Sequence, residues 1–273
     1  MRLFFITVLF FLGFASVTAA QEVRLQSLES GDDAGPWQAV GRLDVGGQGF
    51  CTGALIAPQL VITAAHCLFN KMTGERINHE EIEFLAGWRR GRASAYRMVR
   101  RAVLHPDFFF DGNVSSERVR NDLALLELDR PIRNTTIVAF DTGARPLTGD
   151  RVGIVSYAHD RAEAPSLQEV CRVLARQEGV LVTSCKVDFG SSGAPIFVFS
   201  EGQAQIVSVV SAKAIVNGQH VSLGTALTEP LAFLQSELAS GRGVFQAPGP
   251  QDQRVQVGGV RRDTGAKFVK PMD

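Results

Sequence analysis

From residue 37 onward the chain consists of short apolar or alternating stretches separated by turn residues. Alternation of apolar and polar positions is typical of half-buried β-strands, and short apolar runs bounded by turns are typical of buried ones. Twelve strands are predicted, at 37–43, 49–56, 60–64, 82–88, 96–104, 123–128, 152–157, 169–174, 179–183, 195–199, 205–211 and 221–227. Because no helical segments separate them as βαβ units would require, the pattern predicts an all-β chain folded as barrels or a sandwich.

One helix is predicted after the last strand, at 228–239. Leu231 and Leu234 fall on one face of it, and Gly241 follows its end. We expect Thr228 to cap the N-terminus of this helix with its hydroxyl group.

The two ends of the chain differ from the region between them. Residues 1–20 have one positive charge at Arg2, an apolar core at 3–14 and small residues at the end, which predicts a secretory signal peptide. Its apolar core is too short to span a bilayer comfortably, so we expect an exported protein, secreted or periplasmic, with no transmembrane segment. A short N-terminal segment follows at 21–35. The tail at 241–273 is rich in glycine and charge and is predicted to be disordered.

Composition narrows the function classes. The 28 basic and 28 acidic residues cancel, so no net field favours nucleic acid. Four cysteines in an exported chain predict two disulfides, and the absence of a C-x-x-C pair argues against redox work or structural zinc. Of the three possible connectivities, proximity in sequence favours Cys51 with Cys67 and Cys171 with Cys185. We expect neither a metal nor a cofactor.

A serine in a glycine-rich turn is the candidate nucleophile. Ser192 lies between Gly190 and Gly193, just ahead of an apolar run, where the backbone can turn tightly and a substrate carbonyl can approach. The backbone amides of Gly190 and Ser192 are expected to point the same way and to stabilise an oxyanion. Taken alone, the stretch also fits a simple turn that leads into a strand.

A histidine and an aspartate supply the other two groups that a serine nucleophile needs. His66 ends a strand pair and is held by the expected disulfide of its neighbour Cys67; alone it would more often be structural. Asp122 stands at the start of a strongly apolar strand, where an imidazole N–H would compensate its buried charge. Alone it would more often be a turn residue.

Four segments carry a resemblance to a known family. GSSGAP at 190–195 resembles the GDSGGP of chymotrypsin-like serine proteases, GFCTGALI and TAAHC resemble their FCGGSLI and TAAHC segments, and NDLALLELDRPI at 121–132 resembles their NDIALLKL segment. The chain order His66, Asp122, Ser192 is also the order of that family. The resemblance extends from about residue 36 to about residue 240.

This resemblance implies a fold and an activity. The fold is two six-stranded antiparallel β-barrels, at about 36–135 and 145–227, followed by the helix, all within a peptidase domain at 36–240. The activity is that of a serine endopeptidase that cleaves proteins or peptides through an acyl-enzyme. Ser211 resembles the family serine that bonds the triad aspartate and lines the primary pocket. The alternative is a protease-fold binding protein that has lost catalysis.

Two departures separate the chain from trypsin. Ser191 stands where trypsin has the aspartate that receives its new N-terminus, a pattern similar to that of bacterial glutamyl endopeptidases. Lys186 stands where trypsin has its specificity aspartate, and Lys213 is expected at the pocket rim. Substrates with Lys or Arg at the cleaved position are therefore expected to be disfavoured, and the two lysines would favour an acidic side chain there. Val210 replaces the histidine of glutamyl endopeptidases, which weakens an assignment of Glu specificity.

A cluster of arginines, between Arg89 and Arg101, is a candidate exosite for an anionic partner. The alternative is a solvated loop with charged strand edges, which protect against aggregation.

Overall fold

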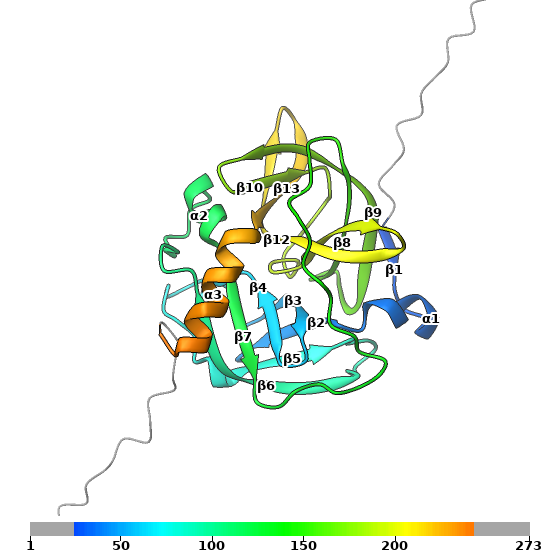
Figure 1. Ribbon diagram of the computed structural model, residues 1–273, viewed down its shortest axis with the longest axis vertical. Helices are drawn as coiled ribbons and strands as arrows, with labels where there is room; N and C mark the ends of the chain where they lie inside the picture. Colours follow the sequence, from blue (N-terminus) through cyan, green and yellow to red (C-terminus); the bar gives the residue numbers. More distant parts are fainter. Residues whose placement is uncertain (1–24, 243–273) are drawn as a thin grey trace, which may run out of the picture.

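The computed structural model describes residues 25–242 (Figure 1). The signal peptide expected at 1–20 and nearly all of the tail expected at 241–273 lie outside the described residues. Within residues 25–242, each helix is too short or too polar to cross a membrane.

The first half of the chain forms a closed antiparallel barrel. Its strands, in the order of their pairing, are β2 (Val40–Val45), β3 (Phe50–Ala57), β4 (Leu60–Thr63), β7 (Ala124–Leu128), β6 (Ala95–Leu104) and β5 (Ile82–Ala86). β5 pairs back onto β2 and closes the ring. β7 is buried along its whole length, as its apolar sequence predicts.

The second half forms a seven-stranded antiparallel sheet. Its strands are β8 (Arg151–Ala158), β9 (Arg161–Gln177), β10 (Val180–Thr183), β11 (Pro195–Ser200), β12 (Gln203–Val216), β13 (Gln219–Ala226) and the short β1 (Leu25–Ser27). β8 pairs with both β9 and β11, so six of the strands form a ring of pairings. β1 adds to the edge of β9 (Figure 1). The predicted fold class, two six-stranded barrels with a C-terminal helix, is confirmed.

Helices and 3-10 turns connect and cover the barrels. They are α1 (Gly31–Ala34), η1 (Gly35–Trp37), η2 (Ala65–Leu68), η3 (His79–Glu81), α2 (Ser116–Asn121) and α3 (Thr228–Ser240). α3 contacts β6 and β7 of the first barrel (Figure 1). Its leucines are buried, and Gly241 ends it with φ 72°. The expected Thr228 cap is wrong: Leu227 is the N-cap residue, and no side chain caps the helix.

All twelve predicted strands overlap an observed one, and the differences have local causes. The strand predicted from Trp37 begins at Val40, because Pro36 and Trp37 belong to the 3-10 turn η1, where proline suits the first turn. β9 extends over 17 residues where a strand was predicted only at 169–174. The first half of β9 pairs with β1 and β8. It contains polar residues, so the sequence there has no apolar run that would have predicted a strand.

Aromatic side chains hold the two barrels together. Phe197 on β11 lies 5.1 Å from the Trp37 ring and 4.8 Å from the Phe140 ring, both in edge-on arrangements. Phe197 is fully buried. Edge-on aromatic pairs of this kind add to the free energy of burial and fix a relative orientation. These contacts therefore fix the position of β11 relative to the segments on either side of the first barrel.

A buried carboxylate ties β6 to β7. Glu127 on β7 is only 9% exposed and accepts hydrogen bonds from Arg100 and Arg101 on β6. Burial by itself raises the pKa of Glu127, but the hydrogen bonds and charges of the two arginines lower it below its ordinary value.

We predict that Glu127→Gln lowers the free energy of unfolding by about 1–3 kcal/mol at pH 7. Because the folded-state pKa is depressed, the carboxylate stabilises the fold above the unfolded-state pKa of about 4.3, and this contribution disappears as the pH falls through the folded-state pKa. Urea unfolding should show that the difference in free energy of unfolding between the wild-type protein and Glu127→Gln is smaller at pH 3 than at pH 7. Glu83, whose pKa is raised by burial and by Asp44, is the control: Glu83→Gln should not destabilise at pH 7. Equal losses for both variants would contradict the assignment.

Candidate active site

The centre of the site is a carboxylate with no exposure to solvent. Asp122 follows α2 directly and caps its C-terminal end. Its Oδ1 accepts the backbone N–H of His66 at 2.8 Å, and its Oδ2 lies 2.6 Å from His66 Nδ1. Ser211 Oγ also donates to Oδ2, at 2.5 Å. The structure therefore brings together His66, Asp122 and Ser211, which the sequence places far apart.

These partners keep the carboxylate charged. Burial alone raises the pKa of Asp122, but the charge on His66 and the hydrogen bonds from the His66 ring, the Ser211 hydroxyl and the His66 N–H lower that pKa below its ordinary range. A buried carboxylate without such donors would cost several kcal/mol, roughly. The arrangement fixes Nδ1 of His66 as the bonded nitrogen and leaves Nε2 available.

Hydrogen bonds from Thr225 to the end of α2 help to position the Asp122 carboxylate. Thr225 on β13 donates its hydroxyl to the carbonyl of Val119, at 2.6 Å, and lies 3.2 Å from the carbonyl of Asp122. Val119 lies in the last turn of α2 and Asp122 follows this helix directly, so the second barrel fixes the helix that presents Asp122. Neither α2 nor Thr225 was anticipated from the sequence. The run Ser115-Ser116-Glu117 was a helix-start signal, since Ser115 accepts from the Arg118 N–H as an N-cap.

His66 lies in η2, immediately after β4. The disulfide between Cys51 and Cys67 joins β3 to η2, with 6.3 Å between the Cα atoms. Both sulfurs lie near the His66 ring but, because they are bonded to each other, they are not thiolate ligands for a metal. A second disulfide joins Cys171 to Cys185, as proximity predicted.

Ser192 lies in a tight turn between β10 and β11. Gly190 has φ 95° and Gly193 has φ 77°, conformations that favour glycine. A Cβ at position 193 would collide with Thr63 Oγ1 and the carbonyl oxygen of Thr52. Both glycines are therefore required where they stand. The Ser192 carbonyl accepts the Thr52 N–H at 2.8 Å, which anchors the turn to the first barrel.

The same turn leaves two N–H groups without partners. Among residues 25–242, no hydrogen bond has the backbone N–H of Gly190 or Ser192 as its donor. The Phe189 carbonyl accepts the His159 N–H at 2.8 Å, and in a trans peptide the following N–H, that of Gly190, points the opposite way. This geometry suits the stabilisation of an oxyanion.

Thr52 is a positioning residue that the sequence interpretation missed. Its buried hydroxyl donates to the Gly190 carbonyl at 2.8 Å and accepts the Tyr157 N–H at 3.1 Å. Together with the bond to the Ser192 carbonyl, Thr52 holds the loop at both of its ends. The signal was present in GFCTGALI, where Thr52 replaces the first glycine of the family's FCGGSLI.

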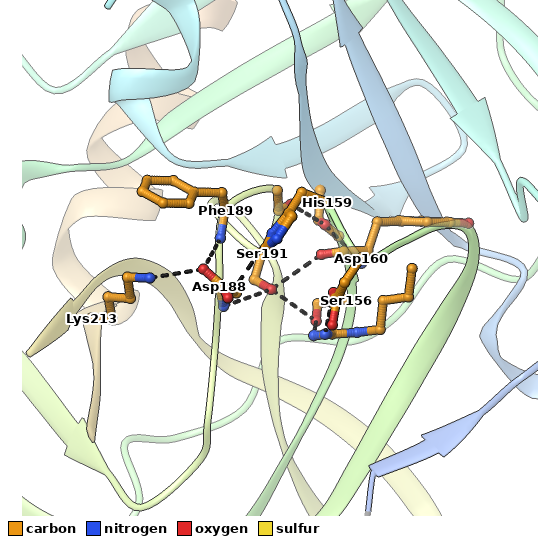
Figure 2. A network of polar contacts seen from close by, with 11 residues as sticks. Ser156, His159, Asp160, Asp188, Phe189, Ser191 and Lys213 are labelled. Atoms are coloured by element: carbon orange, nitrogen blue, oxygen red, sulfur yellow. Dashed lines mark hydrogen bonds and ion pairs between the residues drawn. The ribbon is translucent and has the colours of Figure 1, made fainter. Parts of the chain in front are cut away.

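Ser191 occupies the place of trypsin's aspartate without a charge. It is fully buried, and its Oγ lies 3.1 Å from the Tyr157 carbonyl and 3.2 Å from Ser156 Oγ (Figure 2). The Asp188 N–H points at the same oxygen from 3.4 Å. At Ser191 the turn is thus supported by hydrogen bonds between uncharged groups of this residue and of β8.

His66, Ser192, Ser211 and Lys213 line one hollow of about 310 Å³, which we call the nucleophile hollow. Within the described chain no hydrogen bond joins Ser192 Oγ to His66 Nε2, and such bonds often tighten only when substrate is present. A hydroxyl, a base and a buried acid share this hollow with two free N–H donors. The set is chemically suited to acyl transfer.

Lys213 lies at the rim of the nucleophile hollow, as expected, but its charge is balanced. Its Nζ bonds Asp188 Oδ1 at 2.7 Å and lies 4.4 Å from the centre of the Phe189 ring (Figure 2). The hydrogen bond from Lys213 and that from the Phe189 N–H lower the pKa of Asp188. Lys186 is exposed and does not line the nucleophile hollow; it lines an adjoining hollow with Ile215 and His220, which shares Asp188 and Lys213 with the first.

Most of the candidate exosite arginines have partners within the chain. Arg90 pairs with Glu29 at 3.2 Å, Arg100 and Arg101 bond Glu127, and Arg97 donates to three backbone carbonyls. These contacts reduce the positive charge that is available to an anionic partner.

Comparisons with known proteins agree with this geometry. The model of the trypsin-like peptidase domain matches residues 51–207, more than half of the chain. The chain is 24% identical over 186 residues to the glutamyl endopeptidase of Bacillus licheniformis, covering 66% of this chain and 57% of that protein. It is 27% identical over 164 residues to human serine protease 23, covering 54% and 43%. The chain thus matches about half the length of these relatives.

A solved structure of a Glu endopeptidase in complex with MPD has the same fold. The TM-score is 0.61 at 19% identity, and the match covers 80% of this chain and 96% of the other. His66, Asp122 and Ser192 lie within the residues that the family model matches. The chain therefore belongs to the trypsin-like peptidase family and is similar to the glutamyl endopeptidases within it.

Proposed function

We propose that this protein is an exported serine endopeptidase in which Ser192, His66 and Asp122 act as a catalytic triad. The observation that carries the proposal is the buried Asp122 carboxylate, which bonds His66 Nδ1 at 2.6 Å while the ring and Ser192 face one hollow. A binding protein that had lost catalysis would not need this costly buried charge. The signal peptide expected at 1–20 supports export.

The proposed reaction assigns its steps to the groups of the hollow. His66 Nε2 takes the proton of Ser192 Oγ as the oxygen attacks a peptide carbonyl, and the N–H groups of Gly190 and Ser192 stabilise the oxyanion. His66 then gives the proton to the leaving amine, and an ester remains on Ser192. Water, activated by His66, hydrolyses the ester and frees the serine. Asp122 orients the ring and stabilises its positive charge throughout.

The primary pocket is proposed to select an uncharged residue on the acyl side of the scissile bond. The Bacillus relative is named a glutamyl endopeptidase, but here the ammonium of Lys213 is paired with Asp188. Lys186 does not line the nucleophile hollow. Val187, Val210 and Ala212 supply apolar wall, so a charged side chain that packs against these three residues would lose hydration.

We predict that Ser192→Ala lowers kcat by about 10⁴-fold or more, because the nucleophile is lost. Ser191→Ala should lower it by about tenfold or less, since Ser191 only supports the turn. Peptide hydrolysis and mass mapping of a fluorophosphonate adduct are the measurements. Thermal unfolding is the control for folding. A wild-type protein that neither labels nor cleaves would refute the proposed function, and an adduct on Ser191 would refute the assignment of the nucleophile.

We predict that Thr52→Val lowers kcat by about tenfold to a hundredfold and changes KM less, because the Gly190 carbonyl loses its partner and the oxyanion N–H groups become less ordered. Thr52→Ser keeps the hydroxyl and should retain kcat within about threefold. Binding of a peptide boronic acid, which imitates the tetrahedral intermediate, should weaken in parallel with kcat. If Thr52→Ser loses activity while Thr52→Val retains it, packing of the threonine methyl and not its hydroxyl controls the loop.

We predict that Asp188→Asn creates a preference for glutamate on the acyl side of the scissile bond, because it releases the charge of Lys213. The ratio of kcat/KM for Glu over Gln should rise by roughly fivefold to tenfold, as a newly unpaired cation attracts a carboxylate. Paired fluorogenic peptides give this ratio directly. Adding Lys213→Ala should remove the gain. An unchanged ratio in Asp188→Asn would show that Lys213 does not reach the bound side chain.

A further inference from the structure

Lys71 lies on the turn that follows η2, on the first-barrel side of the cleft. The Asn70 side chain accepts the N–H groups of Met72, at 2.8 Å, and Thr73, at 3.2 Å. The Asn70 N–H bonds the Glu75 carbonyl, and the Gly74 N–H returns to the Asn70 carbonyl, both at 2.8 Å. These bonds fix the backbone of the turn around Lys71.

The Lys71 side chain reaches toward the second barrel. Its Nζ lies 5.6 Å from the centre of the Phe189 ring, within the range of a cation–π contact. Phe189 directly precedes Gly190, whose N–H is a proposed oxyanion donor. The ammonium of Lys71 is therefore held beside the place where a substrate would react, and less side-chain entropy is lost when it binds a partner.

Lys71 also lines two adjoining hollows. One is the nucleophile hollow, and the other, of about 290 Å³, is lined by His66, the Cys51–Cys67 disulfide, Phe50 and the turn itself. We call the second one the leaving-group hollow. Ser192 and the β12 residues Ser211 and Lys213 line the nucleophile hollow and not the leaving-group hollow, so the leaving-group hollow lies on the other side of His66.

Lys213 forms an ion pair with Asp188, whereas Lys71 has no such partner among residues 25–242. Within the same range, no acidic residue is among those that line the leaving-group hollow. A cation in a concave site attracts a carboxylate more strongly than one on a flat surface does.

We propose that Lys71 selects an acidic side chain on the leaving peptide, at the first or second residue after the scissile bond. The inference rests on the proposed function. His66 passes its proton to the leaving amine, so the leaving half of the substrate lies against His66, in the hollow that lacks Ser192 and β12. There the first residues of the leaving peptide come within reach of the Lys71 ammonium.

The test compares peptides that differ at one position only. Fluorogenic substrates with one common acyl-side sequence carry Glu, Gln or Lys at the first or second residue after the cleaved bond. Wild-type protein should favour Glu over Gln by about threefold to tenfold in kcat/KM at one of these positions, the size expected of a partly exposed ion pair. The preference should shrink between 50 and 500 mM NaCl because salt screens it.

Charge reversal gives the sharper measurement. Lys71→Glu should reverse the order, so that the Lys peptide is cleaved faster than the Glu peptide. Arg133→Glu is the matched control, since this exposed residue lies on the connection between the barrels and lines neither hollow. It makes the same change in net charge and should leave the wild-type order unchanged.

A second readout isolates the leaving-group side. Amino-acid amides can replace water in attack on the acyl-enzyme, so that a new peptide bond forms as the Ser192 ester breaks. Glutamic acid amide should then capture more acyl group than glutamine amide with the wild-type protein, and less with Lys71→Glu.

The outcomes separate the two proposals. Cleavage with equal rates for Glu and Gln at both positions, or a preference unaltered in Lys71→Glu, overturns the role of Lys71 and leaves the proposed function intact. A dependence on Lys71 that appears only on the acyl side also overturns it. If the wild-type protein cleaves no peptide and forms no fluorophosphonate adduct, the proposed function fails and this inference fails with it.

Discussion

The fully buried carboxylate of Asp122 is the constraint on which the rest of the site depends. A charge at 0% exposure is tolerated only because three donors meet it, one of them from the other barrel. Those donors are the ring and backbone of His66 and the hydroxyl of Ser211. Satisfying one carboxylate therefore sets the orientation of the histidine and the approach of β12 to the first barrel.

A second set of contacts crosses between the barrels at Thr52. Its hydroxyl and its backbone N–H bind the carbonyls of Gly190 and Ser192, while Phe197 packs against Trp37. These bonds are neutral and buried, so salt and pH affect them little. The geometry of the nucleophile turn thus follows from the docking of two barrels, without a charged group at position 191.

The sequence predicted the strands well and pointed to three residues that the structure brings to one site, because both signals are encoded locally. Alternating apolar runs located the strands, and His66, Asp122 and Ser192 each lie in a short motif that was readable on its own. The local segment showed that Thr52 replaces a glycine, but the roles of Thr52 and Thr225 could not be predicted in this way, because they consist of hydrogen bonds to residues more than a hundred positions away. The pairing of Lys213 with Asp188 was missed for the same reason, since sequence offsets placed the lysine at the rim but gave no partner for it. The Thr228 cap was wrong because a favourable residue type does not fix where the first helical turn begins.

The hydrogen bonds of Thr52 and Ser191 also limit how this chain could diverge. Glycine at position 52 would leave the Gly190 carbonyl and the Tyr157 N–H unpaired, and aspartate at position 191 would bury a charge beside the Tyr157 carbonyl, which now accepts the Ser191 hydroxyl. Either change alone is unfavourable, whereas an inserted N-terminal amine would satisfy the aspartate. Changing from the neutral hydrogen bonds of Thr52 and Ser191 to an ion pair between an aspartate and an N-terminal amine would thus require several simultaneous substitutions. We therefore expect descendants of this chain to keep the neutral arrangement.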